Sequence, residues 1–123
     1  MAKGTPRGGV TTNRTCKLAH SAAVEEGDII ISAQGQVLIA QGNYAQDEEG
    51  IYVFAGPAEM PKKAATALAV GECVYFDTDP GEVTPTEADG TRAGFCLEAA
   101  AAADTVVLIE LMPILPLPTH AHA

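Results

Sequence analysis

Residues 71–86 read GECVYFDTDPGEVTPT, and their acidic DTDPGE run is either a metal-binding loop or the corner between two strands. A calcium loop of the EF-hand type needs oxygen ligands at positions 1, 3 and 5, glycine at position 6 and glutamate at position 12. Counted from Asp77, the third ligand, the glycine and the closing glutamate are all missing. A turn accounts for every residue, because Pro80 presets φ and Gly81 can adopt a positive φ. The stretch therefore predicts two strands joined by a tight turn.

The same succession of motifs occurs twice along the chain. Residues 25–37 and 69–83 share the pattern glycine, acid, three strand formers, turn, glycine, polar residue and valine. Residues 38–55 match residues 94–111, so that the alternating apolar positions of their last strands coincide. Each half predicts a hairpin, a return loop and a further strand. Two such halves can bury their alternating faces against each other, so we expect an all-β domain, a small β-sandwich or barrel with two similar halves.

Composition favours short strands and turns over long helices. The 123 residues suit one domain, and 12 glycines and 8 prolines interrupt the chain. Each proline costs an interior helix about 3 kcal/mol. The segment KKAATALA at 62–69 nevertheless predicts a short helical turn. The segment EAAAAAD at 98–104 parallels QGNYAQDEE at 41–49, and we predict a return loop there despite the helix propensity of alanine.

The two ends of the chain differ from its middle. Residues 1–20 are predicted to form an extended arm, residues 21–112 the β domain and residues 113–123 an extended proline-rich tail. Residues 1–17 hold four of the seven basic residues and no acidic one, which leaves all 16 acidic residues in the rest of the chain. A body this acidic repels phosphate backbones, so nucleic acid is not an expected partner.

The sequence predicts no catalytic residue, no cofactor and no metal site. Cys16 and His20 are four residues apart, but the surrounding TNRTCKLAH is a poor helix and offers no orienting acid. Cys73 and Cys96 lie in apolar strands and are predicted to be small core residues, without a disulfide framework. No apolar run approaches the roughly 18 residues that cross a bilayer, so no membrane partner is expected.

Four short motifs occur in an order that resembles a known protein family. They are the run PKKAA, the glycine-acid step GECVYFD, the strand GEVT and the stretch GFCLEAA, within residues 24–111. The succession resembles the small capsid decoration, or cement, proteins of tailed bacteriophages. The resemblance implies a homotrimeric structural protein on the outside of the head, over the local three-fold axes of the major capsid protein shell, which it stabilises. Its role would be similar to that of the lambda-type decoration proteins.

The resemblance also suggests roles for both termini. The arm would bind the major capsid protein through its basic side chains and through backbone groups that add to an exposed sheet edge. The protein would reach the outer virion surface after assembly in the host cytoplasm. The tail would lie on a neighbouring surface, such as another subunit of the trimer, and its His120 and His122 lack a third metal ligand nearby in sequence. The predicted contact residues are Lys3, Arg7, Arg14 and Lys17 in the arm and Ile114, Leu115 and Leu117 in the tail.

Two other functions stay open from the residues alone. A small β-barrel module that recognises host glycans would need an exposed aromatic platform, for which Tyr44 is the plausible residue. A thiol hydrolase would use Cys16 as nucleophile and His20 as base, and would require a reactive Cys16. The favoured interpretation is a structural virion protein that is not an enzyme.

Overall fold

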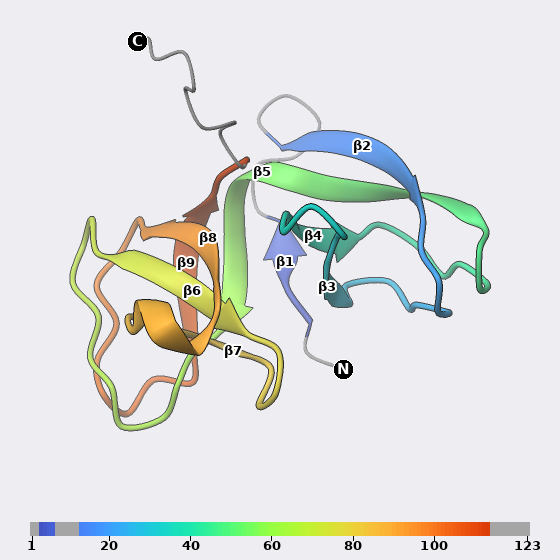
Figure 1. Ribbon diagram of the computed structural model, residues 1–123. Helices are drawn as coiled ribbons and strands as arrows, with labels where there is room; N and C mark the ends of the chain where they lie inside the picture. The colour runs from blue at the N-terminus through green and yellow to red at the C-terminus, as the bar shows by residue number, and fades with distance from the viewer. Residues whose placement is uncertain (1–2, 7–12, 114–123) are drawn as a thin grey trace, which may run out of the picture.

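Nine strands and one short 3₁₀ helix make up the part of the chain that the computed structural model describes, residues 3–6 and 13–113. The strands form one curled, barrel-like sheet in the order β3-β4-β5-β9-β8-β6-β7, with β1 and β2 also paired to β5 (Figure 1). The prediction of an all-β, barrel-like domain is confirmed. The elements are β1 (Thr5–Pro6), β2 (Arg14–Ala19), β3 (Ile29–Ile31), β4 (Val37–Ala40), β5 (Glu49–Pro61), β6 (Cys73–Asp77), β7 (Glu82–Thr84), η1 (Glu87–Asp89), β8 (Thr91–Cys96) and β9 (Val106–Leu111).

The long strand β5 connects the two parts of the sheet. Its first part pairs with β2 and β4, and its second part pairs with β1 and β9. The partners change at Gly56, whose φ of 110° suits glycine, and Figure 1 shows that β5 bends sharply along its length. The side chain of Asn13 donates hydrogen bonds of 3.1 Å to Ala55 O and 3.1 Å to Pro57 O, so carbonyls exposed by the bend are satisfied.

Both predicted hairpins are present. The DTDPG stretch is the turn between β6 and β7: Gly81 N–H donates to Asp77 O at 2.9 Å and Gly81 has a φ of 81°. Asp79 N–H donates to Asp77 Oδ1 at 3.1 Å, as the sequence predicts for an aspartate that opens a turn. The hairpin of β3 and β4 turns at Gly35, which has a φ of 91°.

Hydrogen bonds in the return loops confirm that the two halves are built alike. Val24 and Tyr44 exchange backbone hydrogen bonds of 2.9 and 3.0 Å, and Leu68 and Ala100 exchange two of 2.9 Å. The spacing agrees with the repeat found in the sequence, since Leu68 lies 44 positions after Val24 and Ala100 lies 56 positions after Tyr44. The paired strands β6 and β8 correspond to β3 and β4 of the first half. The second half is longer because β7 and η1 lie between β6 and β8 in the sequence. The segment 98–104 is a return loop, as predicted.

The repeat explains the length of β5. In the first half β2 pairs with β5, and in the second half the later part of β5 pairs with β9 in the same antiparallel way. β5 is therefore the last strand of the first half and the first strand of the second. A single strand that serves both halves must bend between them, which accounts for its 13 residues.

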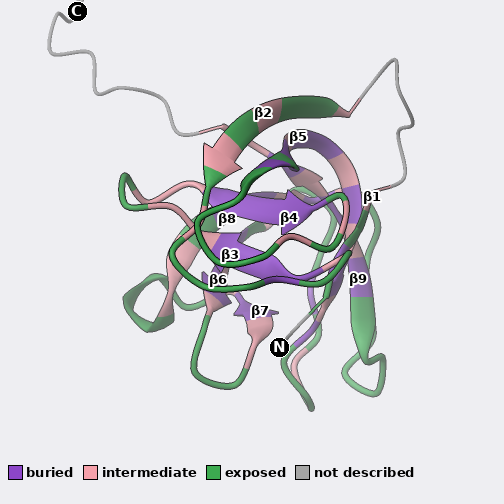
Figure 2. Cartoon of the chain, turned by 90° about the vertical axis from the view of Figure 1, so that its right-hand side faces the viewer, coloured by how far each residue is buried: buried purple, intermediate pink, exposed green. Residues whose placement is uncertain are grey.

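The main core lies inside the closed part of the sheet. The five strands β5, β9, β8, β6 and β7 follow one another, and the parallel bridge between Lys62 and Val83 brings β7 back to the end of β5. Inward side chains of both halves fill this space, including Ile39, Val53 and Ile109, and none of these three is more than 1% exposed. Figure 2 shows the buried β3 and β4 in purple and the more exposed β2 in green and pink.

The prediction of a helical turn over residues 62–69 is wrong. The segment forms turns instead, and Ala65 has a φ of 58°, which a right-handed helix does not permit. Lys62 is only 4% exposed, and its ammonium group donates to the backbone oxygens of Lys63 (2.9 Å), Thr66 and Ala102 (3.4 Å). These hydrogen bonds tie the segment to the return loop, so tertiary contacts outweigh the helix propensity of alanine.

The N-terminal residues that the structure describes are extended but belong to the sheet. β1 pairs with the second part of β5, and β2 pairs with the first part through all six of its residues. This pairing with the chain's own β5 was not foreseen. The domain boundary at residue 20 stays a prediction.

Candidate functional site

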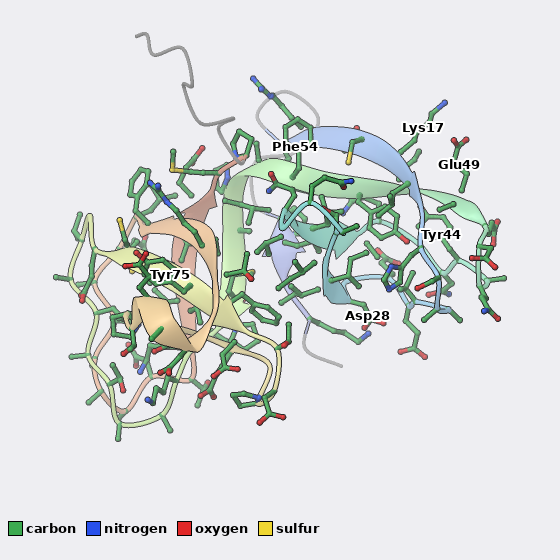
Figure 3. All side chains as sticks on the ribbon, viewed as in Figure 1. Lys17, Asp28, Tyr44, Glu49, Phe54 and Tyr75 are labelled. Atoms are coloured by element: carbon green, nitrogen blue, oxygen red, sulfur yellow. The ribbon has the colours of Figure 1, made fainter. Side chains whose placement is uncertain are left out.

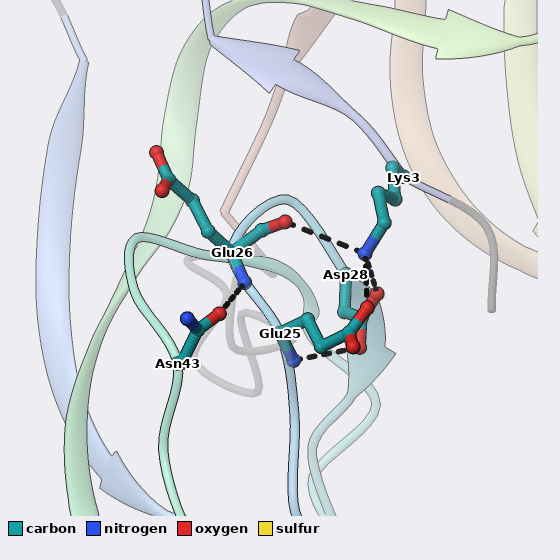
Figure 4. Close-up of polar contacts among 5 residues, drawn as sticks. All are labelled: Lys3, Glu25, Glu26, Asp28 and Asn43. Carbon is teal, nitrogen blue, oxygen red and sulfur yellow. Dashed lines mark hydrogen bonds and ion pairs between the residues drawn. The ribbon is translucent and has the colours of Figure 1, made fainter.

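Lys3 holds the N-terminal end of the described chain against the turn before β3. Its ammonium group forms ion pairs with Asp28 and, at 3.3 Å, with Glu25, and it donates a hydrogen bond of 3.4 Å to Glu26 O (Figure 4). Gly4 N–H donates a hydrogen bond of 2.8 Å to Gly27 O in the same turn. These contacts join two segments that are more than 20 residues apart in sequence.

The carboxylate of Asp28 is the centre of this cluster. Asp28 is 5% exposed and also accepts a hydrogen bond of 2.9 Å from Glu25 N–H. Burial by itself would raise the pKa of Asp28, but the hydrogen bonds from Glu25 N–H and Lys3 outweigh it and hold that pKa below its ordinary value. The hydrogen bond to Asp28 in turn raises the pKa of Lys3. Both groups are charged at neutral pH, and the charge of Lys3 is largely satisfied within the chain.

The acid in the repeated glycine-acid step has the same local role in both halves. Asp28 accepts from the backbone N–H three residues before it, and Glu72 accepts from Ala69 N–H at 3.0 Å. The sequence pattern contained this signal, because an acid that follows a glycine turn can satisfy the free N–H at the start of that turn. The partnership of Asp28 with Lys3 was missed, since no local pattern links them.

Arg14 and Lys17 place positive charge on the exposed strand β2. The guanidinium group of Arg14 lies 5.5 Å from the centre of the Phe54 ring, within cation–π range. Lys17 lies opposite Ile51, which is 44% exposed, and Figure 3 shows Lys17 and Glu49 projecting away from the body. β2 thus presents two basic side chains beside an exposed apolar one. The fourth predicted arm residue, Arg7, and the predicted tail residues Ile114, Leu115 and Leu117 lie outside the described residues.

A second apolar cluster fixes β2 to the sheet. Cys16 and Leu18 of β2, together with Phe54 and Tyr44, pack against a cluster of buried residues. The rings of Tyr44 and Tyr52 are 5.7 Å apart, and a Cβ at Gly50 would come within 2.4 Å of Tyr44. Because these side chains pack closely, β2 is held in place against the sheet. The buried members are Val24, Ile30, Leu38, Ala40 and Tyr52.

The geometry does not assemble Cys16 and His20 into a nucleophile and base. β2 is a strand, and four residues of strand separate the two backbone positions by about 13 Å. Burial raises the pKa of the Cys16 thiol, so the reactive thiolate is disfavoured at neutral pH. The requirement of a thiol hydrolase for a base beside a reactive thiol is not met here.

The described residues offer little support for glycan or metal recognition. All six aromatic residues lie within the described ranges, and each is buried or half-buried, Tyr44 included. Across residues 3–6 and 13–113, no three His, Cys, Asp or Glu side chains gather as metal ligands. In the same part of the chain, no helix has the length and apolar character needed to cross a membrane.

The curled sheet defines a small all-β protein, with Arg14 and Lys17 exposed on its strand β2. Comparison with models of known families matches residues 10–111 to the phage cement protein family. The chain belongs to that family and is a structural protein associated with the phage capsid. No curated protein and no solved structure matches it.

Proposed function

We propose that the protein binds the outer surface of the phage head as a homotrimer, over the local three-fold axes, and stabilises the shell of major capsid protein. The observation that carries this proposal is the family match over residues 10–111. A trimer that engages three sites at once binds far more tightly than one copy, because the second and third contacts form at high effective concentration. Assembly would take place on heads in the host cytoplasm.

The capsid-facing surface is centred on β2. Arg14 and Lys17 are exposed there, and the acidic body behind them makes this basic strip distinct. Acidic groups of the major capsid protein would complement it, and the resulting attraction sets orientation and association rate more than final affinity. Lys3 contributes indirectly, by fixing the N-terminal segment through Asp28. Arg7 is proposed as a further contact.

The test is to mix purified protein with expanded, undecorated phage heads and to measure stoichiometric binding by sedimentation. We expect saturation with trimers, whose mass is measured independently by light scattering. If the intact protein leaves such heads bare, the proposed function is wrong.

A charge-reversal pair tests the role of β2. Arg14→Glu combined with Lys17→Glu should weaken head binding and reduce its dependence on salt. The double variant Lys63→Glu and Arg92→Glu is the matched control, because both side chains are exposed and lie away from β2. If both double variants bind equally well, the basic strip is not the contact surface, although the family role would stand.

A further inference from the structure

The outer edge of β2 has no strand beside it in the part of the chain that the structure describes. Within residues 3–6 and 13–113, β5 is the only strand paired with β2. Gln41 N–H donates to Ile51 O at 3.0 Å, so Ile51 directs its backbone groups toward the β4 side of β5 and its neighbour Tyr52 directs them toward β2. Cys16 is opposite Tyr52 and therefore bonds to β5. Since backbone groups alternate in direction, those of Thr15 and Lys17 point to the open edge.

The repeat shows that the equivalent edge of the second half is covered. The later part of β5 corresponds to β2, and its outer side pairs with β1 through Thr5 and Pro6. A short extended segment thus protects one of two equivalent edges, while the other has no partner among the described residues. An unpaired strand edge invites addition of a further strand.

The C-terminal end of the described chain lies near the start of β2. Leu111 at the end of β9 is opposite Gly56, and Arg14 at the start of β2 is opposite the adjacent Ala55. β9 is antiparallel to the second part of β5, so it runs toward the bend in β5 beside which β2 begins. Arg14 and Pro113 line one groove. A chain that leaves this groove along β2 would start beside Arg14, the first residue of β2, and would run parallel to that strand.

The sequence after Pro113 suits an outermost strand. Residues 114–119 read ILPLPT, and Pro116 and Pro118 have no N–H. In an extended chain these two positions face one side, while Leu115 and Leu117 direct their N–H groups to the other, together with Thr119. Such a segment can pair on one side only, which is the setting in which sheets tolerate proline. Six residues span about 20 Å, the length of the six-residue β2.

We propose that residues 114–119 dock on the outer edge of β2 of the same chain, as a parallel edge strand that pairs through the N–H groups of Leu115, Leu117 and Thr119. This arrangement would close the open edge of the first half as β1 closes that of the second. It is independent of capsid binding, because it concerns the protein free in solution.

Backbone amide hydrogen exchange measured by NMR tests the proposal. In the full chain, the amides of Thr15, Lys17 and Ala19 should exchange slowly, and removal of residues 114–123 should speed their exchange by on the order of tenfold or more. The amides of Cys16 and Leu18 are the internal control, because they bond to β5 and should keep their protection in the truncated chain.

Two proline variants separate pairing from mere proximity. Leu117→Pro removes an N–H that faces β2 and should release Thr15 and Lys17 as truncation does. Ile114→Pro removes an N–H on the side of Pro116 and should leave them protected. Equal exchange at Thr15 and Lys17 in the full and truncated chains would overturn the proposal. Protection that disappears on dilution would also overturn it, because the edge would then be occupied by the tail of a second copy.

Discussion

The first and second halves of the sheet share one plan, a turn, a hairpin, a return loop and a strand, yet they use it differently. The second half closes into a barrel through the Lys62–Val83 bridge and buries its lysine within the fold. The first half leaves β2 at an edge, with Arg14 and Lys17 in solvent. A single plan therefore gives a closed sheet in one half and, among the described residues, an exposed strand in the other.

The largest expected effect is on the close packing of the second half. A Cβ at Gly94 would lie 1.8 Å from Glu110 O, and the paired strand β9 cannot shift without losing its hydrogen bonds to β8. Gly94→Ala should lower the free energy of unfolding by about 3 kcal/mol, measured by urea denaturation. At the hairpin turn of the first half, Gly35→Ala meets no atom within 4 Å and should cost only about 1 kcal/mol of backbone strain. If Gly94→Ala and Gly35→Ala lower the free energy of unfolding equally, contact with β9 is not the reason that Gly94 is sensitive to substitution.

The buried lysine of the second half gives the next largest effect. Lys62→Met keeps most of the side-chain volume but leaves the carbonyls of Lys63, Thr66 and Ala102 without their donor, which should cost about 2 kcal/mol. Lys63→Met is the matched control, since Lys63 is exposed and should change stability by less than about 0.5 kcal/mol. If the two variants unfold at the same urea concentration, the hydrogen bonds of Lys62 do not stabilise the fold.

The ion pair of the first half makes a smaller, pH-dependent contribution. The pKa of Asp28 is lowered in the folded protein, so its stabilising effect is complete above the unfolded value of about 3.9 and is lost as the pH falls through the folded pKa. Asp28→Asn should therefore destabilise the protein at pH 6, and the difference from the wild type should shrink toward pH 3. The measurement is the urea midpoint of both proteins at each pH.

Glu72→Gln is the comparison from the second half. Glu72 makes the same turn contact to Ala69 N–H, and the amide oxygen of glutamine can replace it. No ion pair involves Glu72 among the described residues. Its loss should thus be smaller than that of Asp28→Asn at pH 6. If Glu72→Gln lowers stability as much as Asp28→Asn does at pH 6, the ion pair between Lys3 and Asp28 adds nothing measurable.

The smallest effect is chemical and leaves stability unchanged. Cys96 is buried as predicted, whereas Cys73 in the second half is exposed, so its prediction as a core residue is wrong; Cys16 in the first half is half-buried. Burial raises the pKa of the Cys16 thiol, so alkylation at pH 7.5 should label Cys73 first, Cys16 slowly and Cys96 only after unfolding. Mass spectrometry after increasing times gives the order. Labelling of Cys16 as fast as Cys73 would reopen the possibility of a reactive nucleophile.

The tail proposal sharpens the same comparison. If residues 114–119 cover β2, the two halves have equivalent edges, each closed by an extended terminal segment. If they do not, the first half keeps an open edge that is available for pairing with other chains.

Much of the fold could be predicted from local patterns. Period-two alternation identified the strands, and Pro80 with Gly81 identified the turn between β6 and β7. The repeat of the glycine-acid step predicted two similar halves, and the return loop at 98–104 followed from that repeat against the helix propensity of its alanines. The helical turn at 62–69 was wrongly predicted, because nothing nearby in sequence shows that Lys62 is buried.

The candidate surface was less predictable than the fold. The basic residues of the N-terminal segment were identified, but their separate roles were not: Lys3 is bound to Asp28, whereas Arg14 and Lys17 remain exposed on β2. Asn13 was not singled out, although its side chain satisfies the bend in β5. The roles of Lys3 and Asn13 depend on partners that are 25 or more residues away in sequence.

By itself, the sequence determined the β character of the chain, the positions of its turns and its division into two like halves, because alternation and turn chemistry act over a few residues. Only the tertiary structure decided that β5 belongs to both halves, that β2 pairs with it, and that Lys62 is buried while Arg14 and Lys17 stay exposed on β2. Those outcomes depend on which distant strands pair, and long-range pairing is set by the collective burial of the core and not by any local pattern.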